Sequence, residues 1–132
     1  MKQWITICAA LALTVAAQAA GPRVLFLSKS AGFQHSVITV HEGQPTWAEK
    51  FLTGVVQGLG GTITSTKDAS LINSENLKNY DVVVFYTTGD LTTPGTDKTK
   101  PMEPNGMDQL LAWLKAGGGY VGFHCASDTF HA

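Results

Sequence analysis

The chain is poor in cysteine and in charged residues, and both scarcities restrict what it can do. Its 132 residues include nine Lys+Arg, ten Asp+Glu and two cysteines, with a formal net charge of −1. Because phosphate binding needs clustered cations, this near-neutral balance without a basic stretch argues against nucleic acid as the main partner. Two cysteines cannot form a disulfide framework. The hydrophobic fraction of 44% is ordinary for a globular protein, and the length allows one domain.

The first nineteen residues have the three parts of a secretory signal peptide. Lys2 supplies a positive start, residues 4–17 form an uncharged apolar run, and Ala17-Gln18-Ala19 fits the small-x-small cleavage pattern. The run is too short to span a bilayer comfortably, which takes about 20 apolar residues. We therefore predict a signal peptide over residues 1–19, export to the periplasm or the extracellular space, and no membrane span after cleavage.

The remaining residues predict four strands. Residues 23–28 and 81–86 are continuous apolar runs of the kind buried on both faces of a parallel sheet. Residues 62–66 alternate and are β-branched, which favours a strand near an edge. Residues 120–123 form the fourth strand, after a glycine-rich stop.

Helical spacing lies between these strands, so the strands should be parallel. One helix face is expected in residues 48–59 with Thr46 as its cap, a short helical segment starts at Ser74, and another face occupies residues 107–114. The apolar face in residues 48–59 consists of Ala48, Phe51, Leu52, Val55, Val56 and Leu59. Residues 87–105 are expected to form a long loop. The alternation predicts an α/β fold with helices on both faces of the sheet.

Polar residues collect in the loops that leave three of these strands. In open α/β sheets ligands bind outside the carboxyl ends of the strands. The loops 28–35, 87–90 and 124–128 leave such ends, and they hold His35, His124, Asp90 and Asp128. Asp90 follows Gly89 and is expected to be a turn residue. The other three are candidates for a site.

Three segments of the chain resemble the trehalose-utilisation (ThuA-like) family. They are residues 26–36 (FLSKSAGFQHS), 80–85 (YDVVVF) and 118–128 (GGYVGFHCASD), in family order and at family-like spacing. The resemblance implies a class I glutamine amidotransferase-like, flavodoxin-like fold, which is a three-layer α/β sandwich with a parallel sheet. It also implies utilisation of trehalose or a related glycoside. By the same resemblance, the domain over residues 20–132 is incomplete at its C-terminus, truncated after the fourth strand.

The family's fold has a nucleophile elbow, where a strand turns sharply and presents one side chain. The amidotransferase pattern at this turn is Gly-x-Cys, but here Gly122-Phe123-His124 occupies it, with Cys125 one residue beyond. Glutaminase chemistry is therefore not implied. Cys125 reads as a buried small hydrophobe or, less favoured, as a nucleophile. Asp128 could cap a helix after the elbow, as Ser127 could, or take a catalytic role.

We expect His124, His35 and Asp128 to be the catalytic residues if the protein is an enzyme. A neutral imidazole can act as general base on a sugar, with a second group orienting it or serving as acid. Residues expected to contact the ligand are Ser30, Gly32, Thr88 and Gly89.

Two functions stay open for this His-lined pocket. One is an exported carbohydrate-processing enzyme, and the other is a non-catalytic sugar-binding or accessory module. The partner in both is a carbohydrate or sugar-derived small molecule. Tight His-x-x-x-His spacing is lacking, so neither a metal nor a cofactor is predicted. The other cysteine, Cys8, lies in the predicted signal peptide, so a thiol-redox protein built on Cys125 would lack a second cysteine after cleavage.

Overall fold

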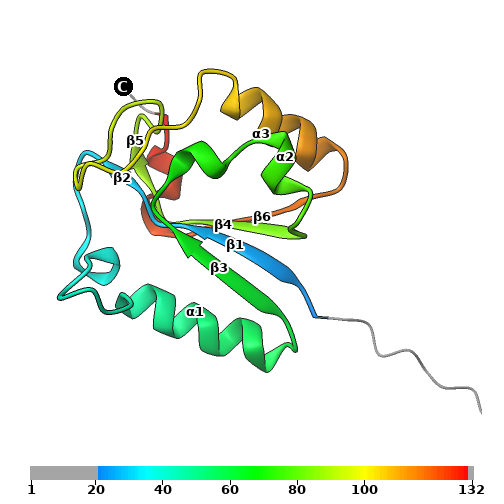
Figure 1. Ribbon diagram of the computed structural model, residues 1–132, viewed down its shortest axis with the longest axis horizontal. Helices are drawn as coiled ribbons and strands as arrows, with labels where there is room; N and C mark the ends of the chain where they lie inside the picture. Colours follow the sequence, from blue (N-terminus) through cyan, green and yellow to red (C-terminus); the bar gives the residue numbers. More distant parts are fainter. Residues whose placement is uncertain (1–20, 131–132) are drawn as a thin grey trace, which may run out of the picture.

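A computed structural model describes residues 21–130, and the predicted signal peptide over residues 1–19 lies outside them. Strands and helices alternate along the chain, as expected (Figure 1). The elements are β1 (Arg23–Leu27), β2 (Ser30–Ala31), η1 (Ser36–Ile38), α1 (Trp47–Gly58), β3 (Thr62–Thr66), η2 (Ala69–Leu71), α2 (Ser74–Leu77), β4 (Val82–Phe85), β5 (Thr88–Gly89), α3 (Gly106–Lys115), β6 (Gly119–Gly122) and η3 (His124–Asp128).

The main sheet has four parallel strands in the order β3-β1-β4-β6. In its register, Phe26 of β1 lies between Ser65 of β3 and Val84 of β4. The chain moves outward from β1 to β3, then crosses back to β4 on the other side of β1. The carboxyl ends of β1 and β4 therefore flank the point where the topology reverses, which is where open α/β sheets bind ligands.

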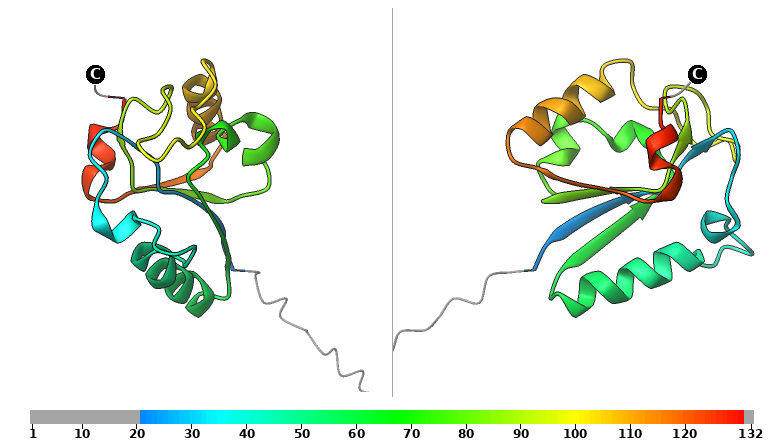
Figure 2. Two further views of the ribbon diagram at one scale, coloured as in Figure 1. Left: turned by 60° about the vertical axis from the view of Figure 1, so that its left-hand side comes forward. Right: turned by 180° about the vertical axis from the view of Figure 1, so that it is seen from behind.

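Helices cover both faces of this sheet and make three layers (Figures 1 and 2). The α1 layer packs on one side and the layer of α2 and α3 on the other. Alternate residues of β1 point into the two cores, because successive strand residues face opposite sides. The core on the α1 side contains Val24, Phe26, Ile38, Ala48, Leu52, Val56 and Val84. The core on the other side contains Leu25, Leu27, Ala69, Ile72, Leu77, Val83, Phe85, Leu91, Met102, Leu110 and Ala126.

Helix α1 begins at the predicted cap. The Thr46 hydroxyl accepts a hydrogen bond from the Glu49 amide, and the Glu49 carboxylate accepts one from the Thr46 amide, which together form a capping box. The helix ends before Gly60, whose φ of 71° favours glycine. Both signals were read correctly from the sequence.

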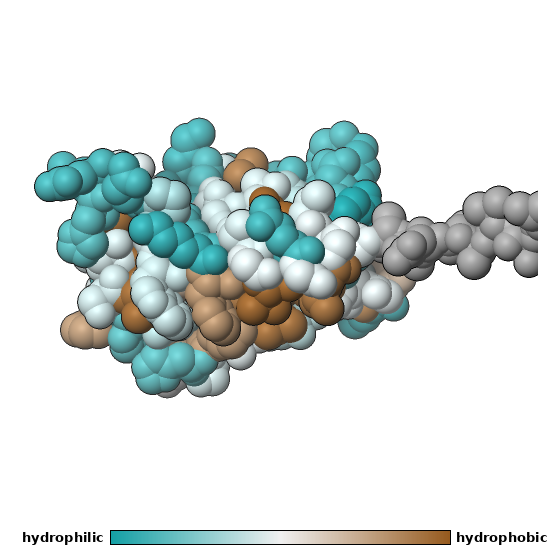
Figure 3. Space-filling model, turned by 90° about the horizontal axis from the view of Figure 1, so that it is seen from below, coloured by the Kyte–Doolittle hydropathy of each residue, from teal (hydrophilic) through white to brown (hydrophobic). Residues whose placement is uncertain are grey.

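Half of the predicted apolar face of α1 is exposed, which corrects the sequence interpretation. Ala48, Leu52 and Val56 are buried against the sheet. The other three members of the predicted face are exposed, namely Phe51, Val55 and Leu59. The helical spacing was right, but the stripe is wider than the part of the helix that the sheet covers. Figure 3, viewed from the α1 side, shows apolar surface on this part of the molecule.

Two short features differ from the sequence expectations. Residues 30–31 and 88–89, expected as loop, pair as the parallel strands β2 and β5 of a small second sheet. Strands of two residues carry too little periodicity to be detected. The short helix α2 is capped by Asn73, whose side chain accepts from the Asn76 amide, so Ser74 is its first residue rather than its cap.

Strand β6 lies at the edge of the described sheet. Its residues Tyr120 and Val121 are 45% and 41% exposed. The chain then enters the 3-10 turn η3. Its N-cap is Phe123, with no side-chain cap, and Ser127 and Asp128 lie inside this turn. Whether either residue caps a later helix stays a prediction. Within residues 21–130, no helix is long and apolar enough to cross a membrane.

Candidate functional site

Two histidines from distant parts of the sequence meet at the carboxyl end of the sheet. The ring centroids of His35 and His124 are 4.7 Å apart, with the planes tilted by 57°. The ring of Tyr86, which follows β4, meets both edge-on, at 5.7 Å from His35 and 6.0 Å from His124. The expected convergence of the two histidines is therefore confirmed. We call His35, Tyr86 and His124 the imidazole site.

His35 is held by the loop that follows β1 and β2. Its carbonyl oxygen accepts hydrogen bonds from the Ile38 amide and the Thr39 hydroxyl, both at 3.1 Å, which start the turn η1. The Phe33 ring packs edge-on against the imidazole at 4.8 Å. The residue is half-buried.

His124 stands at a sharp turn directly after β6. Its φ of 47° is in the left-handed region, which costs a non-glycine residue on the order of 1–3 kcal/mol. Just before the turn, the Phe123 amide donates to the Phe85 carbonyl at 2.9 Å and prolongs the β4–β6 ladder. The strained elbow predicted at Gly122-Phe123-His124 is thus present, and His124 is exposed there.

Cys125 is poorly suited to be a nucleophile. Burial raises the pKa of its thiol, and the neighbouring Asp128 carboxylate raises it further. The reactive thiolate is therefore disfavoured. The thiol is half-buried, so it is less enclosed than the sequence suggested.

Neither carboxylate of the strand-end loops, the candidate Asp128 or the expected turn residue Asp90, is bonded to an imidazole within residues 21–130. Asp128 is exposed at the end of η3, and among the described residues it forms no hydrogen bond or ion pair with His35 or His124. Its catalytic role stays a prediction. The Asp90 carboxylate accepts from the Thr92 amide and hydroxyl, which lowers the pKa of Asp90 and confirms it as a turn residue.

The predicted ligand contacts fall on and beside the β2–β5 sheet. The Thr88 hydroxyl donates to the Phe33 carbonyl at 2.9 Å, and the Gly89 carbonyl accepts from the Phe130 amide. Gly89 has a φ of 69°, and a Cβ there would lie 2.3 Å from the Ala31 carbonyl oxygen. The Ser30 hydroxyl is buried and has no hydrogen-bond partner among residues 21–130. Gly32 is exposed.

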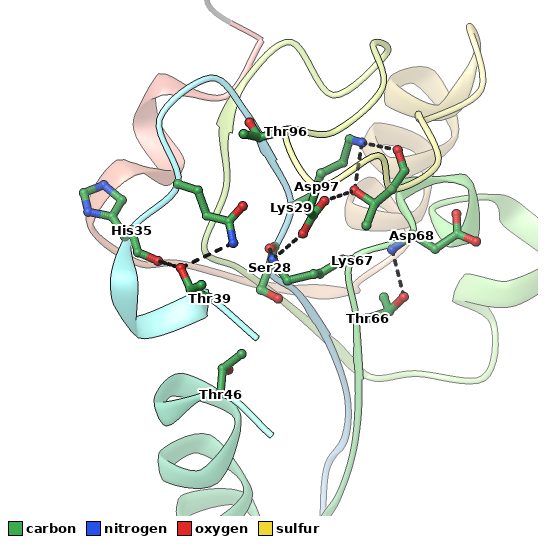
Figure 4. Close-up of polar contacts among 12 residues, drawn as sticks. Ser28, Lys29, His35, Thr39, Thr46, Thr66, Lys67, Asp68, Thr96 and Asp97 are labelled. Carbon is green, nitrogen blue, oxygen red and sulfur yellow. Dashed lines mark hydrogen bonds and ion pairs between the residues drawn. The ribbon is translucent and has the colours of Figure 1, made fainter. Parts of the chain in front are cut away.

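Sequence reasoning missed a charged cluster beside these strand ends (Figure 4). The fully buried Lys29 donates its Nζ to the carbonyls of Thr99 and Lys100, both at 3.1 Å. Burial lowers the pKa of Lys29, an effect that the nearby carboxylates oppose. Lys67 pairs with Asp97 at 2.9 Å and donates to the Ser28 carbonyl.

The charge of Asp97 stabilises this cluster. Burial alone would raise the pKa of Asp97, but hydrogen bonds from Lys67 and Thr99 bring it below its usual value.

Lys67 follows β3 directly, so its position at the carboxyl end of a predicted strand was the sequence signal that could have identified it. The same signal applied to Tyr86, at the end of the predicted strand 81–86.

An apolar hollow of about 90 Å³ adjoins the imidazole site and shares Tyr86 with it. Its lining consists of Val37, Trp47, Ala48, Phe51, Leu52, Tyr86 and Phe123. The rings of Trp47 and Phe51 are stacked, with centroids 5.3 Å apart.

The imidazole site can exchange protons and hydrogen bonds with a polar ligand. A neutral imidazole carries one donor and one acceptor nitrogen, and the phenol of Tyr86 can donate or accept. Burial raises the pKa of Tyr86, which keeps the phenol protonated. Within residues 21–130, no three His, Cys, Asp or Glu side chains are grouped so that they could hold a metal ion.

The parallel sheet, its helical layers and the elbow after β6 define a flavodoxin-like domain of the class I glutamine amidotransferase-like type. A family model described as "Trehalose utilisation" (ThuA) matches residues 23–132. The chain belongs to this family, as its three segments suggested. Comparison with curated proteins gave no match, and neither did comparison with solved structures.

Proposed function

We propose that the protein is exported and acts in carbohydrate utilisation by binding trehalose or a related glycoside at the imidazole site. The observation that carries this proposal is the pairing of His35 and His124, 4.7 Å apart, at the switch point of the sheet. Membership of the trehalose-utilisation family supplies the substrate class. Sugar hydroxyls both donate and accept hydrogen bonds, as the imidazoles and the Tyr86 phenol do.

In the catalytic form of the proposal, one imidazole takes a proton from a sugar hydroxyl or carbon as general base. The second imidazole then orients the substrate or returns the proton. The strained backbone of His124 supports this form, because such strain clusters at functional positions.

A non-catalytic sugar-binding module is the second candidate. It is favoured by one observation, that Asp128 forms no hydrogen bond with either imidazole among the described residues. A histidine that works as general base is commonly oriented by such a partner. A binding site needs only the donors and acceptors themselves.

Calorimetric titration with trehalose tests the shared claim of both forms. The wild-type protein should bind, His124→Gln should lose most of the affinity, and His41→Gln should not, because His41 is an exposed histidine outside the site. Equal binding by both variants, or none by a folded wild type, contradicts the proposal. Chromatography of the sugar after incubation separates the two forms, since only an enzyme changes it.

Export rests on the leader over residues 1–19, whose three parts are typical of signal peptides. Intact mass of the protein recovered from the periplasm or medium should correspond to a chain starting at Ala20. A mass that retains Met1 to Ala19 contradicts export by this route.

A further inference from the structure

Thr96 makes three hydrogen bonds to the segment that leads to His35. Its amide donates to the Ser30 carbonyl at 2.8 Å. Its hydroxyl donates to the Gly32 carbonyl at 2.7 Å and accepts from the Gly32 amide at 3.2 Å. One side chain therefore satisfies both backbone groups of Gly32, in the way that a neighbouring strand would.

The loop that carries Thr96 is itself held in place. The Gly95 amide donates to the Thr99 carbonyl at 2.9 Å, and buried Lys29 donates to that same carbonyl. Asp97 is paired with Lys67 at 2.9 Å (Figure 4). Gly95 leaves no room for a side chain, because a Cβ there would lie 2.2 Å from the Thr99 Oγ1. Thr96 thus sits on a fixed support.

The held segment runs directly into the imidazole site. The next residue after Gly32 is Phe33, whose carbonyl accepts from the Thr88 hydroxyl and whose ring packs on His35. We propose that Thr96 is a positioning residue of the imidazole site: by holding Gly32, its hydroxyl fixes the loop that places His35 against His124. Thr96 itself does not touch either imidazole in the described contacts.

The free energy of unfolding should change little when Thr96 loses its hydroxyl. Gly32 is exposed, so water can replace the lost hydroxyl when Thr96 is changed to valine. The effect should appear in the placement of His35. The inference rests on the proposed function only in its consequence for ligand affinity, so ring placement and affinity are measured separately.

The experiment compares Thr96→Val with the isosteric control Thr93→Val in the full chain labelled with ¹³C-histidine. Thr93 lies in the same loop, and its hydroxyl donates to the Asp90 carbonyl instead. We expect the nuclear Overhauser effect between the His35 and His124 rings to weaken in Thr96→Val and to persist in Thr93→Val. Thr96→Ser keeps the hydroxyl and should keep the effect. Thr96→Val removes both side-chain hydrogen bonds to Gly32, which water can partly replace, so trehalose affinity should fall about two- to tenfold, the ratio for a net loss of one neutral hydrogen bond.

An unchanged ring-to-ring effect in Thr96→Val overturns the inference, as does its loss in a folded Thr96→Ser. If Thr96→Val does not fold, Thr96→Ala removes the same hydroxyl and is compared with Thr93→Ala: the ring-to-ring effect should weaken only in Thr96→Ala, and an unchanged effect there overturns the inference. If trehalose does not bind the wild type but the ring-to-ring effect weakens as expected, the proposed ligand is wrong and the positioning role stands. If trehalose binds the wild type but the ring-to-ring effect is unchanged in Thr96→Val, the proposed ligand stands and the positioning role is wrong.

Discussion

His35 and His124 lie with their ring centroids 4.7 Å apart, although one follows the first strand of the sheet and the other the last. The parallel topology brings them together, because all four strands point their carboxyl ends to the same edge. Only β4 separates β1 from β6, and the Tyr86 ring at its end contacts both histidines. The site is therefore a consequence of strand order.

The ion pair between Arg23 and Asp81 should contribute to stability above about pH 4. Hydrogen bonds from the Arg23 side chain and amide hold the pKa of Asp81 at about 2, below the value of about 3.9 for an unfolded chain. A carboxyl with a lowered folded-state pKa stabilises above its unfolded pKa, and this contribution is lost as the pH falls to the folded pKa.

Asp81→Asn should accordingly lower the urea midpoint at pH 5–7, and the difference from wild type should disappear as the pH falls from about 4 to about 2. Glu103→Gln is the control, because Glu103 is exposed and forms no ion pair within the described chain. A difference that is independent of pH over this range would show that the ion pair is not the cause.

Removal of the α1 capping box should destabilise the fold by about 1 kcal/mol, the usual cost of replacing a threonine N-cap with alanine. Thr46→Ala deletes the acceptor of the Glu49 amide. Thr53→Ala, inside the same helix, has no cap to lose and should be neutral or slightly stabilising. Urea unfolding followed by circular dichroism measures both. Equal effects of the two substitutions would refute the role of the cap.

These two interactions show what the sequence could and could not predict. The cap, the helix end at Gly60 and the β1 and β4 strands were visible because each depends on local residue chemistry or periodicity. The ion pair joins residues far apart in the chain, and no local pattern marks it. The same holds for the contact of Tyr86 with the two histidines, which depends on strand order.

Replacing Lys29 should cost more than replacing a surface lysine of the same region. Lys29→Met removes the charged donor from the Thr99 and Lys100 carbonyls, each of which keeps a hydrogen bond from a backbone amide. The loss of hydrogen bonds from a charged group costs about 1.5–3 kcal/mol. Lys98→Met is the control, since Lys98 is exposed in the same loop. Chemical denaturation of both variants should separate them clearly. A Lys29→Met protein as stable as Lys98→Met would mean that the lysine does not hold this loop.

Cys125 should react slowly with iodoacetamide at pH 8 in the folded protein. Burial and the Asp128 charge raise the pKa of the thiol, so little thiolate is present. Mass spectrometry of peptides after timed alkylation gives the rate, and the same protein in urea is the reference. Labelling as fast in the folded as in the unfolded state would restore Cys125 as a candidate nucleophile.

The central claim is that His35 and His124 together form a sugar site. Its most direct test is titration of ¹³C-histidine-labelled protein with trehalose, following the ring signals of both residues by NMR. The account predicts that both signals shift along one saturation curve while the His41 signal stays in place. Saturable binding that moves neither His35 nor His124 would contradict it.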